Sequence, residues 1–365
     1  MFDMIVRWYQ RRFSDPHAVS LVAILLFGFI TIYFFGHLLA PFLLAIVIAY
    51  LLEWPVMKMV RVGIPRTIAV ILVLILFVSL MLLALFGLIP TIWSQVSNLL
   101  NDIPSMFAGL QNFVNTIPEN YPELANMQIV EPVMSNAKDQ IVALGETMVK
   151  GSLSSLVSIA TLVVYLILVP LLVFFLLKDK ETMLDMLSSF MPKNRRLATR
   201  VWREMNQQIS NYIRGKVMEI LVVGAVSYVT FAVLDLRYSV LLSVAVGLSV
   251  LIPYIGAAAV TVPVAIVGLF QWGLTPDFYW LLASYGVIQA LDGNLLVPVL
   301  FSEAVNLHPV AIIISVLFFG GLWGFWGVFF AIPLATLVKA VWNAIKSQDE
   351  GDAVEESSES ESSSD

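Results

Sequence analysis

Leu251-Ile252-Pro253-Tyr254-Ile255-Gly256 and Gly320-Gly321-Leu322-Trp323-Gly324-Phe325-Trp326-Gly327 are the two stretches that decide how this chain folds. Each interrupts an uncharged apolar segment, 239–271 in the first case and 309–338 in the second. Because proline has no N–H and glycine weakens a helix, both stretches predict a break. Two halves of about 15 residues would each be about 22 Å long, against a hydrocarbon core of about 30 Å. We therefore expect two hairpins that enter a membrane partway; one long bent span each is the alternative.

The two broken segments match each other at an offset of 71 residues, which aligns Gly256 with Gly327. An apolar stretch that could cross the membrane precedes each segment, at 217–234 and 278–300. If these two spans run in opposite directions, the hairpins enter from opposite sides, as in the inverted repeats of secondary transporters. The alternative is that the glycines only permit close helix packing.

Composition places the whole chain in a lipid environment. Of its 365 residues 59% are hydrophobic and only 13% are charged, about half the charged fraction of a soluble protein. We expect an all-α polytopic membrane protein with about six full spans, the two broken hairpins and a small helical domain outside the membrane. Two short spans joined by a tight turn near His37 and Pro41 are expected within 18–52, and Pro90 is expected to end the third. The remaining full spans are expected at 67–89, 153–177, 217–234 and 278–300.

Charge distribution gives the domain boundaries and the orientation. Lys and Arg gather in 1–17, 53–66 and 178–216, which fall on one side when the spans alternate, and the positive-inside rule makes that side cytoplasmic. Both termini are then cytoplasmic. The expected parts are a cytoplasmic N-terminus 1–17, three spans 18–90, a periplasmic helical domain 91–152, a fourth span 153–177, cytoplasmic amphipathic helices 178–216, a transport core 217–342 and a disordered acidic tail 347–365.

Asp292 is the first candidate for a functional residue. An ionisable side chain within a span is costly and marks a functional site by default. Gln289 lies one turn earlier on the same helix face, and Asn294 points elsewhere unless Gly293 unwinds the helix. The alternative for Asp292 is an interhelical hydrogen bond that only fixes packing. The predicted substrate or ion pathway consists of Asp292, Gln289, Asn294, Pro253, Gly256, Gly324 and Gly327, and the predicted cytoplasmic mouth consists of Glu303, His308 and Arg214.

Three charged residues also have structural interpretations. Glu219, near the cytoplasmic end of its span, is interpreted as a side chain that snorkels towards the membrane surface. Arg214 with Asn211 is expected to bridge the cytoplasmic helix to the bundle, and Arg237 is expected to pair with Asp235.

Several short motifs resemble the PerM-like permease family, also called the autoinducer-2 exporter family. They include Ile64-Pro65-Arg66, Tyr212-Ile213-Arg214-Gly215, Ile252-Pro253-Tyr254-Ile255-Gly256 and Leu307-His308-Pro309. The resemblance covers nearly the whole chain except 91–150 and the acidic tail. It implies a bacterial inner-membrane protein that forms homo-oligomers, with export of small solutes in some members and cation–proton exchange in others.

Three functions remain open on these grounds. The first is a permease that exports small polar solutes, autoinducer-2-like by resemblance, through a secondary mechanism. Whether an ion is coupled to this transport is left open. The second is a sodium or other cation/proton antiporter, and the third is a membrane scaffold that binds partners through its cytoplasmic helices. An enzyme is not expected, because the sequence contains no His-Glu-x-x-His, Gly-x-Ser-x-Gly or phosphate-binding glycine loop. The absence of cysteine and three scattered histidines predict no metal and no cofactor, and no nucleic-acid partner is expected.

Overall fold

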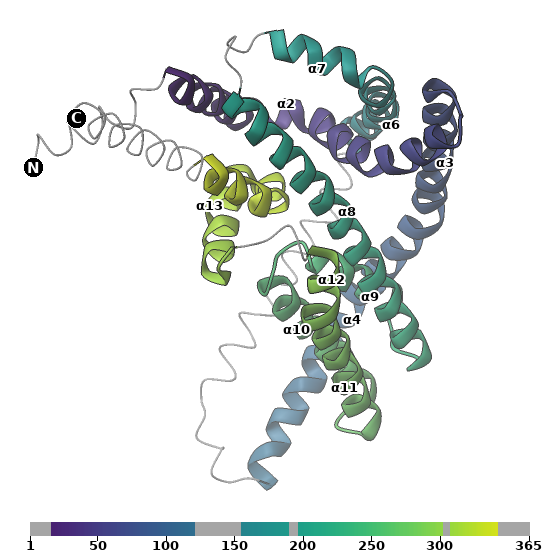
Figure 1. Ribbon diagram of the computed structural model, residues 1–365. Coiled ribbons are helices and arrows are strands. Elements are labelled where there is room, and N and C mark those ends of the chain that lie inside the picture. Colours follow the sequence, from purple (N-terminus) through teal and green to yellow (C-terminus); the bar gives the residue numbers. More distant parts are fainter. Residues whose placement is uncertain (1–15, 121–154, 190–195, 302–306, 342–365) are drawn as a thin grey trace, which may run out of the picture.

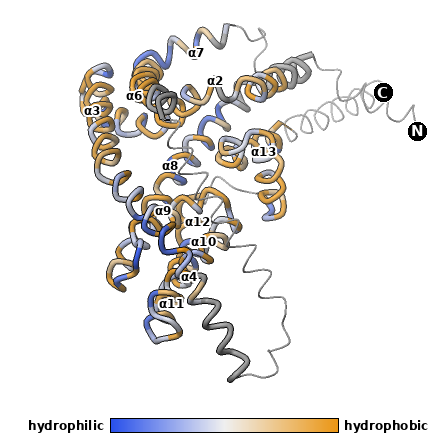
Figure 2. Tube along the Cα trace, turned by 180° about the vertical axis from the view of Figure 1, so that it is seen from behind, coloured by the Kyte–Doolittle hydropathy of each residue, from blue (hydrophilic) through white to orange (hydrophobic). Residues whose placement is uncertain are grey.

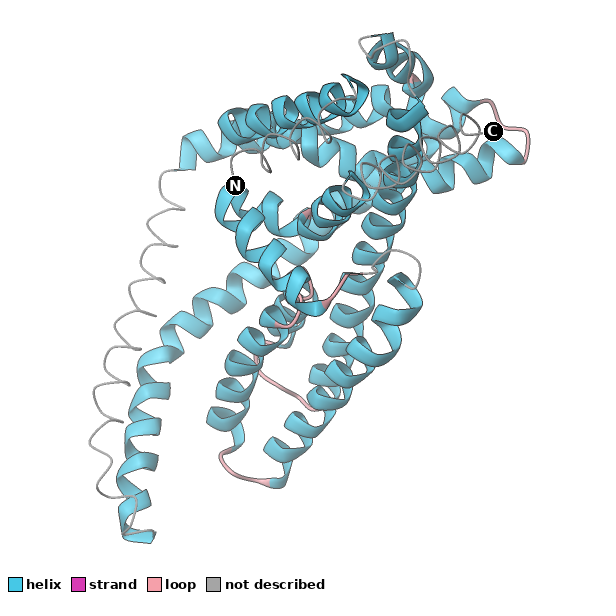
Figure 3. Cartoon of the chain, turned by 60° about the vertical axis from the view of Figure 1, so that its left-hand side comes forward, coloured by secondary structure: helices cyan, strands magenta, loops and turns pink. Residues whose placement is uncertain are grey.

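The computed structural model describes residues 16–120, 155–189, 196–301 and 307–341, and in these ranges every regular element is a helix (Figures 1 and 3). Within the described residues, six helices are long and apolar enough to cross a membrane, and the bent pair α6–α7 makes a possible seventh. Figure 2 shows hydrophobic residues along most of α3, α6 and α13 and hydrophilic stretches on α7. The expected all-α polytopic membrane fold is confirmed.

The first helix is longer than expected. Helix α2 (Pro16–Arg61) has 46 residues and contains Pro41 and Pro55 in its interior. The tight turn predicted near His37 and Pro41 is therefore wrong. A proline inside an apolar helix is tolerated when neighbouring groups satisfy the freed carbonyl, and α2 packs against α3, α6 and α8.

The helix that follows is also continuous where an end was predicted. Helix α3 (Arg66–Leu83) passes through a π-helical turn, η1 (Ala84–Leu88), into α4 (Ile89–Asn120). The prediction that Pro90 ends this span is wrong. Proline cannot donate to the carbonyl four residues earlier, and the π turn changes the hydrogen-bond pattern just before it. Residues 91–120 of the expected periplasmic domain thus continue the third helix, and residues 121–152 lie outside the described ranges.

Helices α6 (Ser155–Lys178) and α7 (Lys180–Ser189) meet at an angle of 80°. Arg66 holds this corner, because its Nε and Nη2 atoms donate to the carbonyl of Leu177 at 2.9 and 2.7 Å. Glu53 of α2 completes the contact with ion pairs to Arg66 at 3.3 Å and to Lys180 at 3.0 Å. Polar groups of four helices, α2, α3, α6 and α7, thereby satisfy one another at this corner.

Helix α8 (Arg196–Val233) crosses the middle of the molecule and packs against both α2 and the helices that follow it (Figure 1). After it, α9 (Ser239–Ser249) and α10 (Ile255–Trp272) form the first hairpin, residues 239–272. Helix α11 (Pro276–Leu291), the π-helical turn η3 (Asp292–Leu296) and α12 (Val297–Phe301) come next. The second hairpin, residues 309–341, consists of α13 (Pro309–Phe329) and the helix Ala331–Val341.

Both hairpins break at the predicted residues, although their halves are unequal. The first breaks at Tyr254, whose φ of 63° is rare for a residue other than glycine, and the second breaks at Gly324, with φ 57° and ψ −132°. In the first hairpin α9 has 11 residues and α10 has 18, so the expectation of halves of about 15 residues is wrong there. In the second hairpin 15 residues, 309–323, precede the kink at Gly324, as expected.

Two glycines allow the hairpins to close. A Cβ atom at Gly256 would lie 1.8 Å from the carbonyl oxygen of Ser249, and a Cβ atom at Gly327 would lie 1.8 Å from that of Phe319. No side chain fits at either position. The two glycines that the internal match of the sequence aligned thus have the same role in the two hairpins.

A methyl group at either position should therefore disrupt its hairpin. We expect Gly256→Ala and Gly327→Ala each to destabilise the protein by about 1–3 kcal/mol or more, the usual cost of overpacking. The measurement is the melting temperature of the detergent-purified protein. Gly286→Ala in α11 is the matched control, because nothing lies within 4 Å of the point that its added Cβ atom would occupy. Equal melting temperatures for all three variants would contradict the packing role.

The turn after α8 and the first turn of α9 are tied to α4. The hydroxyl group of Tyr238 donates to Asp102, and the side chain of Gln95 accepts the N–H of Leu241 at 2.8 Å. Arg237 lies 3.9 Å from Asp102, so its predicted pairing with Asp235 is wrong. Burial and the hydrogen bond to the Asp102 carboxylate raise the pKa of Tyr238 to about 12. The phenol consequently stays protonated, as a donor must, at every physiological pH.

Loss of this donor should loosen the α4 contact. We expect Tyr238→Phe to lower the melting temperature, and by the same amount at about pH 7 and about pH 9, because both lie below the ordinary tyrosine pKa of about 10. In the wild type the contribution should fade only as the pH rises from about 10, the unfolded value, to about 12, the folded value. A difference between wild type and variant that vanishes by about pH 9 would disprove this assignment.

Candidate functional site

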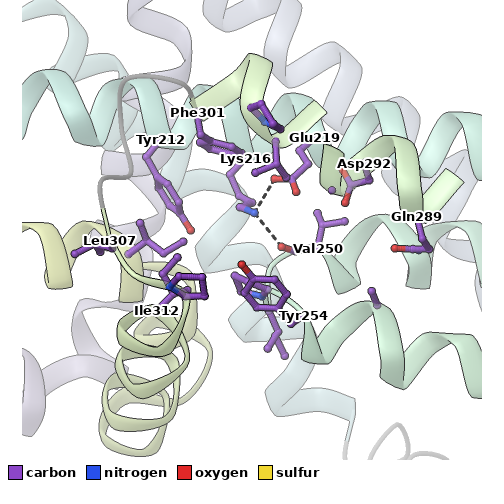
Figure 4. Close-up of a pocket in the computed structure, with 18 residues that line it drawn as sticks. Tyr212, Lys216, Glu219, Val250, Tyr254, Gln289, Asp292, Phe301, Leu307 and Ile312 are labelled. Carbon is purple, nitrogen blue, oxygen red and sulfur yellow. Dashed lines mark hydrogen bonds and ion pairs between the residues drawn. The ribbon is translucent and has the colours of Figure 1, made fainter. Parts of the chain in front are cut away.

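The two hairpins, α8 and the α11–α12 helix enclose a cavity of about 630 Å³ (Figure 4). Most of its lining is aliphatic or aromatic. The polar or ionisable lining side chains are Tyr212, Lys216, Glu219, Tyr254, Gln289 and Asp292. A cavity of this size with a few convergent polar groups is typical of a site for a small molecule.

An ion pair lies on α8 at the wall of this cavity. Lys216 and Glu219 are three residues apart, and their Nζ and Oε2 atoms lie 2.6 Å apart. The two residues are only 4% and 2% exposed. The prediction that Glu219 snorkels at a helix end is wrong, because its carboxylate points into the protein towards Lys216. The i, i+3 spacing of opposite charges was the sequence signal that could have found this pair.

The same face of α8 supplies donors to the backbone at both hairpin breaks. Lys216 Nζ donates to the carbonyl of Val250 at 2.9 Å, and the Tyr212 hydroxyl donates to the carbonyl of Phe329 at 2.9 Å. In a continuous helix Phe329 would accept from residue 333, which is a proline without an N–H. Two carbonyl groups near the breaks thus receive side-chain donors in place of helical N–H groups.

Asp292 and Gln289 line the same cavity from the α11–α12 helix. Asp292 begins the π-helical turn η3, and such turns are frequent at functional sites. Its Oδ1 atom is buried without a hydrogen-bond partner, as is the Nε2 atom of Gln289. In Figure 4 the carboxylate of Asp292 lies beside Glu219. An unpartnered carboxylate oxygen and an unpartnered amide nitrogen are available to a polar solute or an ion.

The other predicted residues have more varied positions. Pro253 lines the cavity, whereas Asn294 is exposed and donates to Ala290 of its own helix. His308 is exposed and caps α13 by accepting the N–H of Val310. Arg214 hydrogen-bonds to Ser210 and Asn211 of its own helix, so its predicted bridge to the rest of the bundle is wrong. The remaining predicted position, residue 303, lies outside the described ranges.

The three predicted glycines shape the site without lining it. Gly256 and Gly327 serve close backbone packing, and Gly324 supplies the kink of the second hairpin. The alternative prediction is that the glycines of the breaks permit close helix packing. Gly256 and Gly327 do so. Among the described residues there is no group of three or more His, Cys, Asp or Glu side chains with the arrangement of a metal site.

Span-length apolar helices around a mostly apolar cavity with a few polar groups, and two broken hairpins forming two of its walls, define a multi-pass membrane protein of the transporter class. The AI-2E family transporter pattern matches residues 6–347. "Putative permease PerM" of Escherichia coli (strain K12) is 55% identical over 344 residues, which are 94% of this chain and 98% of that protein. "AI-2 transport protein TqsA" of the same strain is 25% identical over 325 residues, 88% of this chain and 89% of that protein. The chain belongs to the AI-2E transporter family, as its motifs indicated.

The buried pair makes a sharp prediction about stability. We expect Lys216→Met to cost about 3–5 kcal/mol, because it leaves the Glu219 charge buried without a counter-charge. The double variant Lys216→Met with Glu219→Gln should recover most of this loss, since removal of both charges of a buried pair is often nearly neutral. Melting temperatures of the purified variants test both statements. A double variant no more stable than Lys216→Met alone would contradict them.

Proposed function

We propose that this protein is a permease that moves small polar solutes across the membrane through the cavity between the two hairpins. One observation carries the proposal: a buried carboxylate oxygen of Asp292 and a buried amide nitrogen of Gln289 have no hydrogen-bond partner in the protein and lie at this cavity. Unpartnered buried polar groups are costly, so a site that keeps them is better explained by a ligand that satisfies them.

The charges of the cavity support ion coupling. Among the lining residues that the structure describes, Glu219 and Asp292 are acidic and Lys216 alone is basic. With Lys216 paired to Glu219, the charge of Asp292 is left to be balanced by a proton, by Na⁺ or by the solute. This arrangement supports a secondary mechanism in which the protonation or cation occupancy of Asp292 accompanies solute movement. An autoinducer-2-like solute is suggested by the name of the relative, "AI-2 transport protein TqsA", and export is suggested by the family resemblance.

A cation/proton antiporter is the second candidate. It is favoured by the same surplus carboxylate, because two acidic groups near one lysine can exchange a proton for a metal cation without any organic solute. The two candidates differ in what crosses the membrane with the ion. Flux measurements with and without a panel of solutes distinguish them.

The setting we propose is the bacterial inner membrane, with both termini in the cytoplasm. The support for this orientation is the distribution of Lys and Arg, which lies in 1–17, 53–66 and 178–216. Assembly into a homo-oligomer belongs to the same proposal. Its support is the family resemblance, together with the benefit of burying polar-interrupted hairpins against protein.

The test is flux through purified protein in liposomes under imposed proton or sodium gradients, with a panel of small polar solutes. We expect Asp292→Asn to reduce flux to the level of empty liposomes while expression and melting temperature remain close to wild type. The reason is that the amide keeps the shape of the side chain but neither ionises nor balances a cation.

Asp277→Asn is the matched control for this substitution. Asp277 lies on the same helix, in the first turn of α11, and is exposed. Flux through this variant should equal that of the wild type. Wild-type flux in Asp292→Asn would remove Asp292 from the mechanism, and absence of flux for every solute and ion in the wild type would overturn the proposed function.

A further inference from the structure

Helix α8 contacts three of the elements that enclose the cavity within five consecutive residues. Tyr212 and Lys216 are four residues apart and therefore share a face of the helix. They donate to the second and the first hairpin respectively. Gly215 between them lies against α12, where a Cβ atom would be 2.8 Å from a ring carbon of Phe301. Each hairpin thus receives one side-chain hydrogen bond from α8, and the first hairpin also packs along α8 through α9.

The Lys216 contact is the stronger of the two. Its donor is a charged ammonium group, and hydrogen bonds from charged donors are roughly twice as strong as those between neutral groups. The acceptor is the carbonyl of Val250, the residue directly after the end of α9. Tyr254, four residues later, has a non-helical backbone conformation. The ammonium has three N–H donors and reaches both this carbonyl and the Glu219 carboxylate. Lys216 therefore joins the break of the first hairpin to a fixed charge on α8.

We propose that Lys216 is a positioning residue of the transport pathway that latches the break of the first hairpin to α8. Movement of this hairpin, which would change access to the cavity, requires the ammonium to leave Val250. Glu219 keeps the ammonium paired when that happens, so the latch opens without exposing an isolated buried charge. This inference rests on the proposed function, because a permease needs its cavity walls to move.

The chain contains no cysteine, so a distance across the latch can be measured without altering a native thiol. Val233→Cys at the far end of α8 and Ala258→Cys in the first turn of α10 are both exposed positions outside the cavity lining. Residue 233 lies about 25 Å along α8 from Lys216, so a label there does not disturb the latch. The measured distance is the one between the labels at residues 233 and 258. Double electron–electron resonance on the doubly labelled protein in liposomes, without solute, reports how firmly the first hairpin is held.

We expect one dominant distance in the wild type and a broader distribution after Lys216→Met. The population outside the dominant distance should grow about tenfold, the shift produced by losing one hydrogen bond to a charged donor. Lys216→Arg should keep the wild-type distribution, since a guanidinium also donates to a carbonyl. Tyr212→Phe is the matched control, because it removes the bond to the second hairpin and should leave this distance unchanged.

The double variant Lys216→Met with Glu219→Gln separates a latch from a simple counter-charge. It restores the charge balance but not the bond to Val250, so its distribution should remain broad although its melting temperature recovers. A wild-type distribution in Lys216→Met, or a narrow one restored in the double variant, would overturn the latch.

Flux through the same variants connects the latch to transport. We expect Lys216→Arg to keep wild-type flux and the double variant to lose most of it. If the double variant has a broad distance distribution but wild-type flux, the latch has no role in transport, although the contact between Lys216 and Val250 still holds the hairpin. The distances are measured without solute, so they test the latch even if the wild type carries no solute. Absence of flux in the wild type would overturn the proposed function and not the latch.

Discussion

The arrangement of this protein depends on satisfying backbone groups that broken helices leave without partners inside an apolar bundle. An unpaired carbonyl is expensive where lipid tails are the solvent, so a break persists only where another part of the protein donates to it. Helix α8 does so twice, with the ammonium of Lys216 at one break and the hydroxyl of Tyr212 at the other. One helix therefore supplies the donor to a carbonyl group near each break.

Close backbone contact is the second requirement, and it explains why the two hairpins resemble each other. Gly256 and Gly327 each lie against a carbonyl group of the preceding helix, where any side chain would collide. Their separation of 71 residues is the offset at which the two segments match. The same solution to the same packing problem at matched positions supports a repeated unit of span and hairpin, a construction common among secondary transporters.

Charge inside the bundle is distributed unequally, and this inequality links structure to function. Lys216 is balanced by Glu219, and a balanced pair costs far less than an isolated charge in an apolar setting. Asp292 lies at the same cavity with one oxygen unpartnered, on a π-helical turn that takes its segment out of regular helical geometry. The structure thus combines a charge-balanced ion pair at the cavity wall with a further carboxylate, that of Asp292, whose unpartnered oxygen a solute or an ion would satisfy.

The sequence by itself determined the class of fold, the membrane environment and the two breaks, because composition and the placement of proline and glycine act locally. It also singled out Asp292, which lines the cavity, although a role in transport stays a prediction. It was wrong about the turn near His37 and the stop at Pro90, because neighbouring helices and a π turn accommodate prolines that local rules treat as ends. Only the tertiary structure could decide that Lys216 and Tyr212 of α8 meet Val250 and Phe329, since these contacts join residues that are far apart in the chain. Their chemistry is visible in the sequence, but their partners depend on how the hairpins fold back against α8.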